Sequence, residues 1–280
     1  MITIIHKYVY GGNDGIADFI RGSLNLYSFC IKRNYSYYID FEDSIFNICF
    51  DVNQGTIPKT QKIIYIQLNQ LNFESILEKG EYIEDTLDDT IKKNTSNEDE
   101  VFEVTCNCIN ITKDLFVDSF KEFFKPSKLI LNYIKTLNLP NDYVAVHLRY
   151  SDKFINDTKY EGNPEEFKET ILKIFPNEKN IIFFSNNSLL KKNLNKYFII
   201  HDIEIIHTNN LGYLNNNSVE LYIKTIAEFY MISFSKKVLS LNMYSGFSHI
   251  SSYLEGKEYI VTYKNKHLKF LNNYISFQNS

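Results

Sequence analysis

Tryptophan is absent from the 280-residue chain, and cysteine and proline are scarce, at four and five residues. Cys30, Cys49, Cys106 and Cys108 form no C-x-x-C pair and have no accompanying histidine spacing, so they indicate neither a zinc site nor a disulfide framework. We therefore expect buried, reduced thiols and no metal centre built on them.

Long apolar runs and an excess of basic charge are also lacking. No stretch is long and apolar enough for a membrane span, and the opening Met-Ile-Thr-Ile-Ile-His has neither the charged region nor the apolar core of a secretory signal. These absences predict a soluble, cytoplasmic protein without a transmembrane segment. A net charge of −4 excludes the overall basic field that drives general nucleic-acid binding, so no nucleic-acid partner is expected.

Three signatures of nucleotide sites are missing as well. The chain has no Walker A loop, no G-x-G-x-x-G after its first predicted strand and no D-x-D pair for a metal-bound nucleotide. A nicotinamide-dependent dehydrogenase or sugar epimerase is therefore disfavoured. Any phosphate would be met by arginine and by helix N-termini, without a metal ion.

What is present is a globular composition, with 44% hydrophobic and 15% aromatic residues. The length is near the upper size for one core, so we predict two domains, 1–139 and 140–280, with one large doubly wound domain as the alternative. Acidic residues cluster without periodicity between 80 and 103, which predicts a solvated insertion in the first domain.

Apolar runs and helical periodicities alternate along both halves, which is typical of parallel α/β sheets. The N-terminal half predicts strands at 2–10, 35–39 and 63–66, with helices from residue 16 and at 69–79. The C-terminal half predicts strands at 143–148, 180–184, 203–206, 237–241 and 258–263, separated by helices at 163–175, 187–197 and 218–234 and by one starting near Ser245.

Polar residues follow three of these strands. His147-Leu148-Arg149-Tyr150-Ser151-Asp152 ends one strand, a glycine loop containing Gly12, Asn13 and Gly15 follows the first, and Ser245-Gly246-Phe247-Ser248 begins a helix. Each has a plain structural explanation: a surface pair of Arg149 with Asp152, a tight turn, and a serine cap. However, all three open at the carboxyl ends of parallel strands, where α/β proteins bind ligands, so together they predict one nucleotide-sugar site.

In this order the motifs resemble the α-1,2-fucosyltransferases and, more loosely, the GDP-fucose-dependent superfamily that includes α-1,6- and protein O-fucosyltransferases. The family motif H-x-R-R-x-D is similar to the run at 147–152, and the likeness extends from about residue 8 to 255. The other similar segments are Gly12–Asp18, Tyr37–Asp40, Phe183–Asn187, Glu228–Ser233 and Ser245–Ser248.

The resemblance implies a GT-B-like α/β fold, with two Rossmann-like domains facing across a cleft and the donor bound mainly by the second. It implies an inverting, metal-independent transfer of fucose from GDP-fucose to a glycan hydroxyl, with no cofactor beyond this donor. Arg149 would contact the β-phosphate, His147 and Asp152 would shape the pocket, and residues 245–248 would hold the pyrophosphate. Ser185, Glu228 and Phe247 complete the expected donor-binding set.

The chain departs from the family pattern at several positions. Tyr150 replaces a second arginine, which puts the linkage and the sugar in doubt, and Asn186-Asn187 replaces a carboxylate pair. Asp14 and Asp18 are then the candidates for the catalytic base, although Asp18 equally suits a helix first turn. The alternatives are transfer from another nucleotide-sugar and a non-catalytic protein that binds nucleotide-sugars or glycans.

Overall fold

The computed structural model describes residues 1–8, 15–41, 46–59, 63–68, 83–96, 100–106, 115–149, 163–200, 219–241, 245–263, 266–271 and 274–276. The chain divides into two compact units, Met1–Ser127 and Lys128–Ser280. The division therefore falls before the predicted joint at 139/140. The helix at Lys128–Thr136, which the prediction gave to the first domain, packs on a helix of the second unit.

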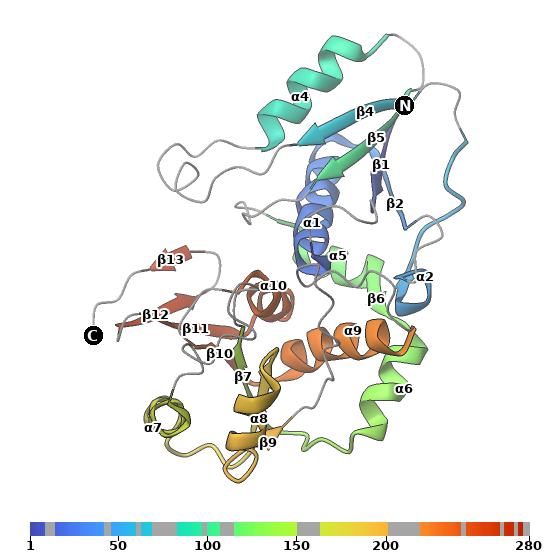
Figure 1. The fold of residues 1–280 in the computed structure, drawn as a ribbon. Coiled ribbons are helices and arrows are strands. Elements are labelled where there is room, and N and C mark those ends of the chain that lie inside the picture. Colours follow the sequence, from blue (N-terminus) through green and yellow to red (C-terminus); the bar gives the residue numbers. More distant parts are fainter. Residues whose placement is uncertain are drawn as a thin grey trace. The chain divides into compact units, whose positions relative to one another are not determined.

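The first unit is built on a four-stranded parallel sheet of order β2-β1-β5-β4 (Figure 1). Helix α1 covers one face of this sheet because Phe19, Ile20 and Leu24 recur at helical spacing and are fully buried. The helix ends at Asn34, whose left-handed backbone returns its N–H to the carbonyl of Cys30. The elements are β1 Ile2–Lys7, α1 Ile16–Arg33, β2 Ser36–Asp40, β4 Ile63–Leu68, α4 Ile83–Asn94 and β5 Glu100–Cys106.

The acidic segment at 80–103 is not a solvated insertion, and this prediction was wrong. Within it lie α4 and the start of β5, which pairs with β1 on one side and β4 on the other. Leu87 and Ile91 of α4 and Phe102 of β5 are buried, and acidic residues such as Asp88 and Glu103 stand next to them in the sequence. Because of these carboxylates, the hydrophobic periodicity of the sequence did not reveal the short apolar stripe.

A smaller antiparallel pair completes the first unit. Strand β3, Phe50–Val52, pairs with β6, Phe124–Pro126, and the tilted rings of Phe50 and Phe124 lie with their centroids 4.4 Å apart. Two short helices precede these strands, α2 at Phe46–Cys49 and α5 at Val117–Phe123.

The second unit contains a seven-stranded sheet of order β13-β12-β11-β10-β7-β8-β9. Strands β11, β10, β7 and β8 are parallel, as predicted. The short parallel strand β9 and the antiparallel edge formed by β12 and β13 were not predicted. The predicted strand at 203–206 and helix at 69–79 lie outside the described residues. The elements are α6 Lys128–Thr136, β7 Val144–Leu148, α7 Pro164–Ile174, β8 Ile181–Ser185, α8 Ser188–Leu194, β9 Ile199–Ile200, α9 Val219–Phe234, β10 Lys237–Ser240, α10 Gly246–Leu254, β11 Glu258–Tyr263, β12 Lys266–Leu271 and β13 Tyr274–Ser276.

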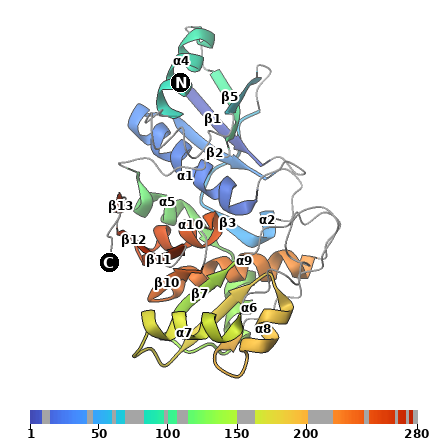
Figure 2. The same cartoon turned by 60° about the vertical axis from the view of Figure 1, so that its left-hand side comes forward.

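Alternate residues of β7 enter two cores on opposite faces of this sheet. Val144 and Val146 pack with α7 and α8 on one face, and Ala145 packs with Met231 and Ile232 of α9 on the other. Figure 2 shows these helices flanking the sheet. No helix in the described ranges has the length and apolarity that a bilayer crossing needs.

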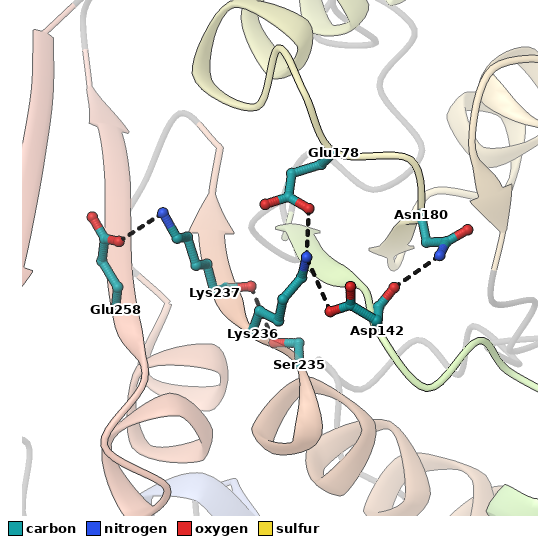
Figure 3. A network of polar contacts seen from close by, with 7 residues as sticks. All are labelled: Asp142, Glu178, Asn180, Ser235, Lys236, Lys237 and Glu258. Atoms are coloured by element: carbon teal, nitrogen blue, oxygen red, sulfur yellow. Dashed lines mark hydrogen bonds and ion pairs between the residues drawn. The ribbon is translucent and has the colours of Figure 1, made fainter.

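Ion pairs hold together the amino ends of the parallel strands (Figure 3). Lys236, just before β10, lies 2.7 Å from Glu178 and 3.0 Å from Asp142, the residues that precede β8 and β7. Lys237 pairs with Glu258 of β11 at 3.2 Å. These charged side chains pair with one another at the amino edge of the sheet, opposite the carboxyl ends of the strands.

Replacing Phe102 tests the corrected assignment of the acidic segment. Phe102→Ala should lower the free energy of unfolding by about 3–5 kcal/mol, since it empties a fully buried site in the central part of the first sheet. The exposed Asp89→Ala on α4 is the control and should change it by less than about 0.5 kcal/mol. If both variants change the free energy of unfolding by the same small amount in urea denaturation, the segment is a solvated insertion after all.

Candidate functional site

The carboxyl edge of the second sheet brings together the ends of β7, β8 and β10. Register pairs His147 with Ser240 and Leu148 with Ser185, so these strands finish side by side. The N–H of Leu241 donates to the carbonyl of His147 at 2.9 Å and extends the ladder past β10. The ends of β7 and β10, two of the three strand ends predicted to form one site, therefore lie at one edge of this sheet.

His147 is a buried, neutral histidine. Its Nδ1 lies 3.1 Å from the hydroxyl of Ser248, and its ring lies against Phe247 with centroids 5.9 Å apart. Burial, aided by the nearby Arg149 guanidinium, lowers the pKa of His147 to about 3. When Ser248 donates to Nδ1, the ring proton is on Nε2, which then offers one uncharged donor at the strand end.

Tyr259 of β11 fixes the start of α10, a role the sequence did not reveal. Its hydroxyl donates to the carbonyl of Ser245 at 3.1 Å, accepts from the N–H of Ser245 at 3.2 Å and lies 3.3 Å from the hydroxyl of Ser248. Tyr259 is 2% exposed. The first turn of α10 is thus fixed by the side chain of Tyr259, which follows Ser245 by fourteen residues and Ser248 by eleven.

The start of α10 is left with polar groups that lack partners. Ser245 occupies the N-cap in an extended conformation, but its side chain caps nothing, and its buried hydroxyl has no hydrogen-bond partner among the described residues. Gly246, Phe247 and Ser248 form the first turn of α10, and their N–H groups have no acceptor within the helix or elsewhere among the described residues. Free N–H groups at the positive end of a helix dipole form an anion-binding site.

Arg149 supplies the cation next to this site. It directly follows β7, is exposed, and is close enough to His147 to affect its charge state. Ser185 lies at the same edge but serves the turn into α8, since its hydroxyl accepts from the N–H of Asn187 at 3.1 Å. Asn187 in turn caps α8 by accepting from Leu190 at 2.8 Å.

Glu228 is partly buried on α9, one turn before Met231 and Ile232 of the core. Burial raises the pKa of Glu228 to about 8, and the positive charge of Lys191 acts in the opposite direction. Neighbouring Phe229 contacts Phe247 edge to face, with ring centroids 5.5 Å apart. Glu228 is therefore a carboxyl group whose ionisation depends on its surroundings.

In the first unit the structure describes two of the predicted site residues. Gly15 is the N-cap of α1, with ordinary backbone angles and open space where a side chain would lie. The carboxylate of Asp18 accepts a hydrogen bond from the guanidinium of Arg21, which is 3% exposed. The other predicted residues lie outside the described ranges, namely Gly12, Asn13, Asp14 and Asp152.

Comparison with known proteins finds no matching family model and no matching curated protein. Among solved structures, the chain is similar to the α-1,6-fucosyltransferase NodZ soaked with GDP-fucose, at 13% identity and a TM-score of 0.59, over 96% of this chain and 99% of that one. A structure of NodZ from Bradyrhizobium gives 13% identity and a TM-score of 0.61, over 96% and 98%. POFUT1 in complex with GDP gives 14% identity and a TM-score of 0.52, over 89% and 94%.

These similarities show the fold: a mixed α/β architecture with parallel sheets, like that of the fucosyltransferase structures. The predicted GT-B-like fold class is confirmed at this level.

The buried state of His147 predicts a pH dependence of stability. An unfolded histidine has a pKa near 6.5, so below that pH the unfolded chain binds a proton that native His147, with its pKa of about 3, does not. His147 therefore lowers stability as the pH falls from about 6.5 towards 3, by up to about 1.4 kcal/mol per pH unit.

Urea denaturation of the wild type and His147→Gln at pH 7.5 and 5.0 measures this contribution. The wild type should lose about 2 kcal/mol more than the variant between the two values. Equal losses would show that native His147 takes up the proton and is not held neutral.

Proposed function

We propose that this chain is a glycosyltransferase that moves fucose from GDP-fucose to a glycan hydroxyl. The observation that carries the proposal is the start of α10. Its three first-turn N–H groups and the buried hydroxyl of Ser245 have no partner among the described residues, and they lie at the same sheet edge as Arg149. A diphosphate supplies the acceptors that these donors lack. Support comes from the fold, because the similar structures include NodZ soaked with GDP-fucose and POFUT1 bound to GDP.

The chemistry follows from where charge develops. The bond between the anomeric carbon and the β-phosphate oxygen breaks, and negative charge grows on the departing GDP. Arg149 and the α10 N-terminus stabilise that charge more in the transition state than in the ground state, which lowers the barrier. His147, being neutral, contributes a hydrogen bond and no charge, and Ser185 and Phe247 shape the surroundings.

The acceptor hydroxyl attacks the anomeric carbon from the opposite side, so the configuration is inverted, and its proton passes to a base. Asp14 and Asp18 remain the proposed bases. Asp18 has to accept the proton while its carboxylate is paired with the guanidinium of Arg21. Transfer needs no metal ion in this scheme, because a guanidinium and helix N–H groups neutralise the diphosphate. The finer proposal is an α-1,2 linkage. Tyr150, which replaces the second arginine of the family motif, is the position that bears on this linkage.

Bulk at the first turn of α10 should block the donor. Gly246→Val is expected to abolish GDP binding, because its side chain occupies the space in front of the free N–H groups. Ser245→Ala removes only one hydroxyl and should cost a moderate part of the affinity. Thermal unfolding with GDP measures both, since a ligand at 100 times its dissociation constant adds about 2.7 kcal/mol of stability.

UDP serves as the control nucleotide in this assay. A folded Gly246→Val protein that binds GDP with unchanged affinity would show that the pyrophosphate does not lie on α10.

Arg149 should be needed for transfer itself. Arg149→Ala is expected to abolish transfer from GDP-fucose and to leave the fold intact, because this side chain is exposed. Arg149→Lys should recover little, since an ammonium lacks the planar fork that binds a phosphate at two points. Transfer assays in excess EDTA should give the wild-type rate; near-normal activity of the alanine variant, or complete loss on chelation, would contradict the mechanism.

A further inference from the structure

His147 can offer a ligand either a donor or an acceptor, depending on which ring nitrogen carries the proton. A neutral imidazole has a donor at one nitrogen and an acceptor at the other. Nδ1 lies 3.1 Å from the hydroxyl of Ser248, and Nε2 has no hydrogen-bond partner among the described residues. The direction in which Ser248 donates its proton therefore decides what Nε2 presents at the sheet edge.

The hydroxyl of Ser248 has three acceptors within reach for its single proton. They are Nδ1 of His147 at 3.1 Å, the hydroxyl of Tyr259 at 3.3 Å and the carbonyl of Ser245 at 3.4 Å. A serine in a helix can donate back to a carbonyl three or four residues before it, which here is that of Ser245. With that bond formed, Ser248 would accept from Nδ1 and Nε2 would have no proton.

Tyr259 occupies the carbonyl that this back-bond needs. The oxygen of Ser245 has two lone pairs, and it accepts from the helical N–H of His249 at 2.9 Å and from the hydroxyl of Tyr259 at 3.1 Å. The Tyr259 oxygen in turn accepts from the N–H of Ser245 at 3.2 Å. Nδ1 of His147 is then the acceptor left for Ser248, and it is also the nearest of the three.

This network lies in the interior and involves a neutral ring. The side chains of His147, Ser248 and Tyr259 are all buried, so bulk water does not compete for their hydrogen bonds. Burial also lowers the pKa of His147 to about 3. At neutral pH the ring therefore carries one proton, and its neighbours determine where that proton lies.

We propose that Tyr259 is a positioning residue for diphosphate binding, because it directs the Ser248 hydroxyl to Nδ1 of His147. The ring proton is then on Nε2, where it is a donor for the diphosphate of the ligand. A donor at Nε2 adds to the N–H groups at the start of α10, whereas an Nε2 without a proton would set its lone pair against phosphate oxygens. The inference rests on the proposed use of a GDP-linked donor.

Removing the hydroxyl of Tyr259 should reverse the tautomer. In Tyr259→Phe the carbonyl of Ser245 is open to Ser248, which donates to it. The Ser248 oxygen then accepts from Nδ1 of His147, so the ring proton moves from Nε2 to Nδ1 with no change in charge. The loss of one hydrogen bond to a charged group should weaken GDP affinity by about 10- to 100-fold.

NMR chemical shifts of the histidine ring nitrogens in the unliganded protein test the tautomer directly, and the spectrum of His147→Gln identifies His147 among the six histidines. We expect Nε2–H in the wild type and Nδ1–H in Tyr259→Phe. Tyr143→Phe is the matched control, because it also removes a buried hydroxyl that donates to a helix carbonyl, that of Met231, and it should keep the wild-type tautomer. The same tautomer in the wild type and Tyr259→Phe would overturn the role of Tyr259 and leave the glycosyltransferase proposal intact.

GDP affinity separates this role from a purely structural one. The amide of His147→Gln supplies an N–H donor that does not depend on Ser248, so adding Tyr259→Phe to this variant should change the dissociation constant of GDP by less than about twofold. An equal loss of affinity in both backgrounds would show that Tyr259 only holds the helix, and would overturn the proposal. Unchanged GDP affinity in Tyr259→Phe alone would overturn it as well.

Two further outcomes complete the test. If Tyr259→Phe does not fold, Ser248→Ala should give a mixture of both His147 tautomers, and a pure Nε2–H tautomer in that variant would overturn the proposal. If the wild type binds no GDP, both the proposed function and this inference are overturned.

Discussion

A chain of hydrogen bonds from His147 to Ser248 to Tyr259 is the constraint on which the candidate site depends. It ties the end of β7 to the first turn of α10 and to strand β11, which lies on the other side of β10 in the sheet. Because Tyr259 also engages both backbone groups of Ser245, the start of α10 cannot turn to satisfy its own N–H groups. The helix N-terminus is therefore preorganised for a ligand at the sheet edge.

Burial decides which groups of this edge carry charge. His147 is buried and stays neutral, whereas the guanidinium of the adjacent Arg149 is exposed to solvent. Glu228 lies between these extremes, because burial favours its neutral form and Lys191 favours its ionised form. The edge thus combines an exposed guanidinium, a neutral hydrogen-bonding ring and a carboxyl group whose charge depends on its surroundings.

The sequence predicted the parts of this fold that rest on local patterns. The strands at 144–148, 181–185 and 237–240 and the helix starting after Ser245 were expected, because unbroken apolar runs and capping residues mark them. Helix α4 and strand β5 were missed, since acidic residues interrupt their apolar stripes. The sequence could not predict the role of Tyr259, because this role depends on contacts between segments that are not adjacent and not on residue spacing.

Amide chemical shifts during a GDP titration would test the central claim, that the start of α10 binds the diphosphate. The account predicts that the amide signals of Gly246, Phe247 and Ser248 shift furthest and in proportion to occupancy, together with the side chain of Arg149. Signals in α4, in the first unit, serve as the internal reference. Saturable GDP binding that leaves the chemical shifts of the α10 amides unchanged would contradict the account.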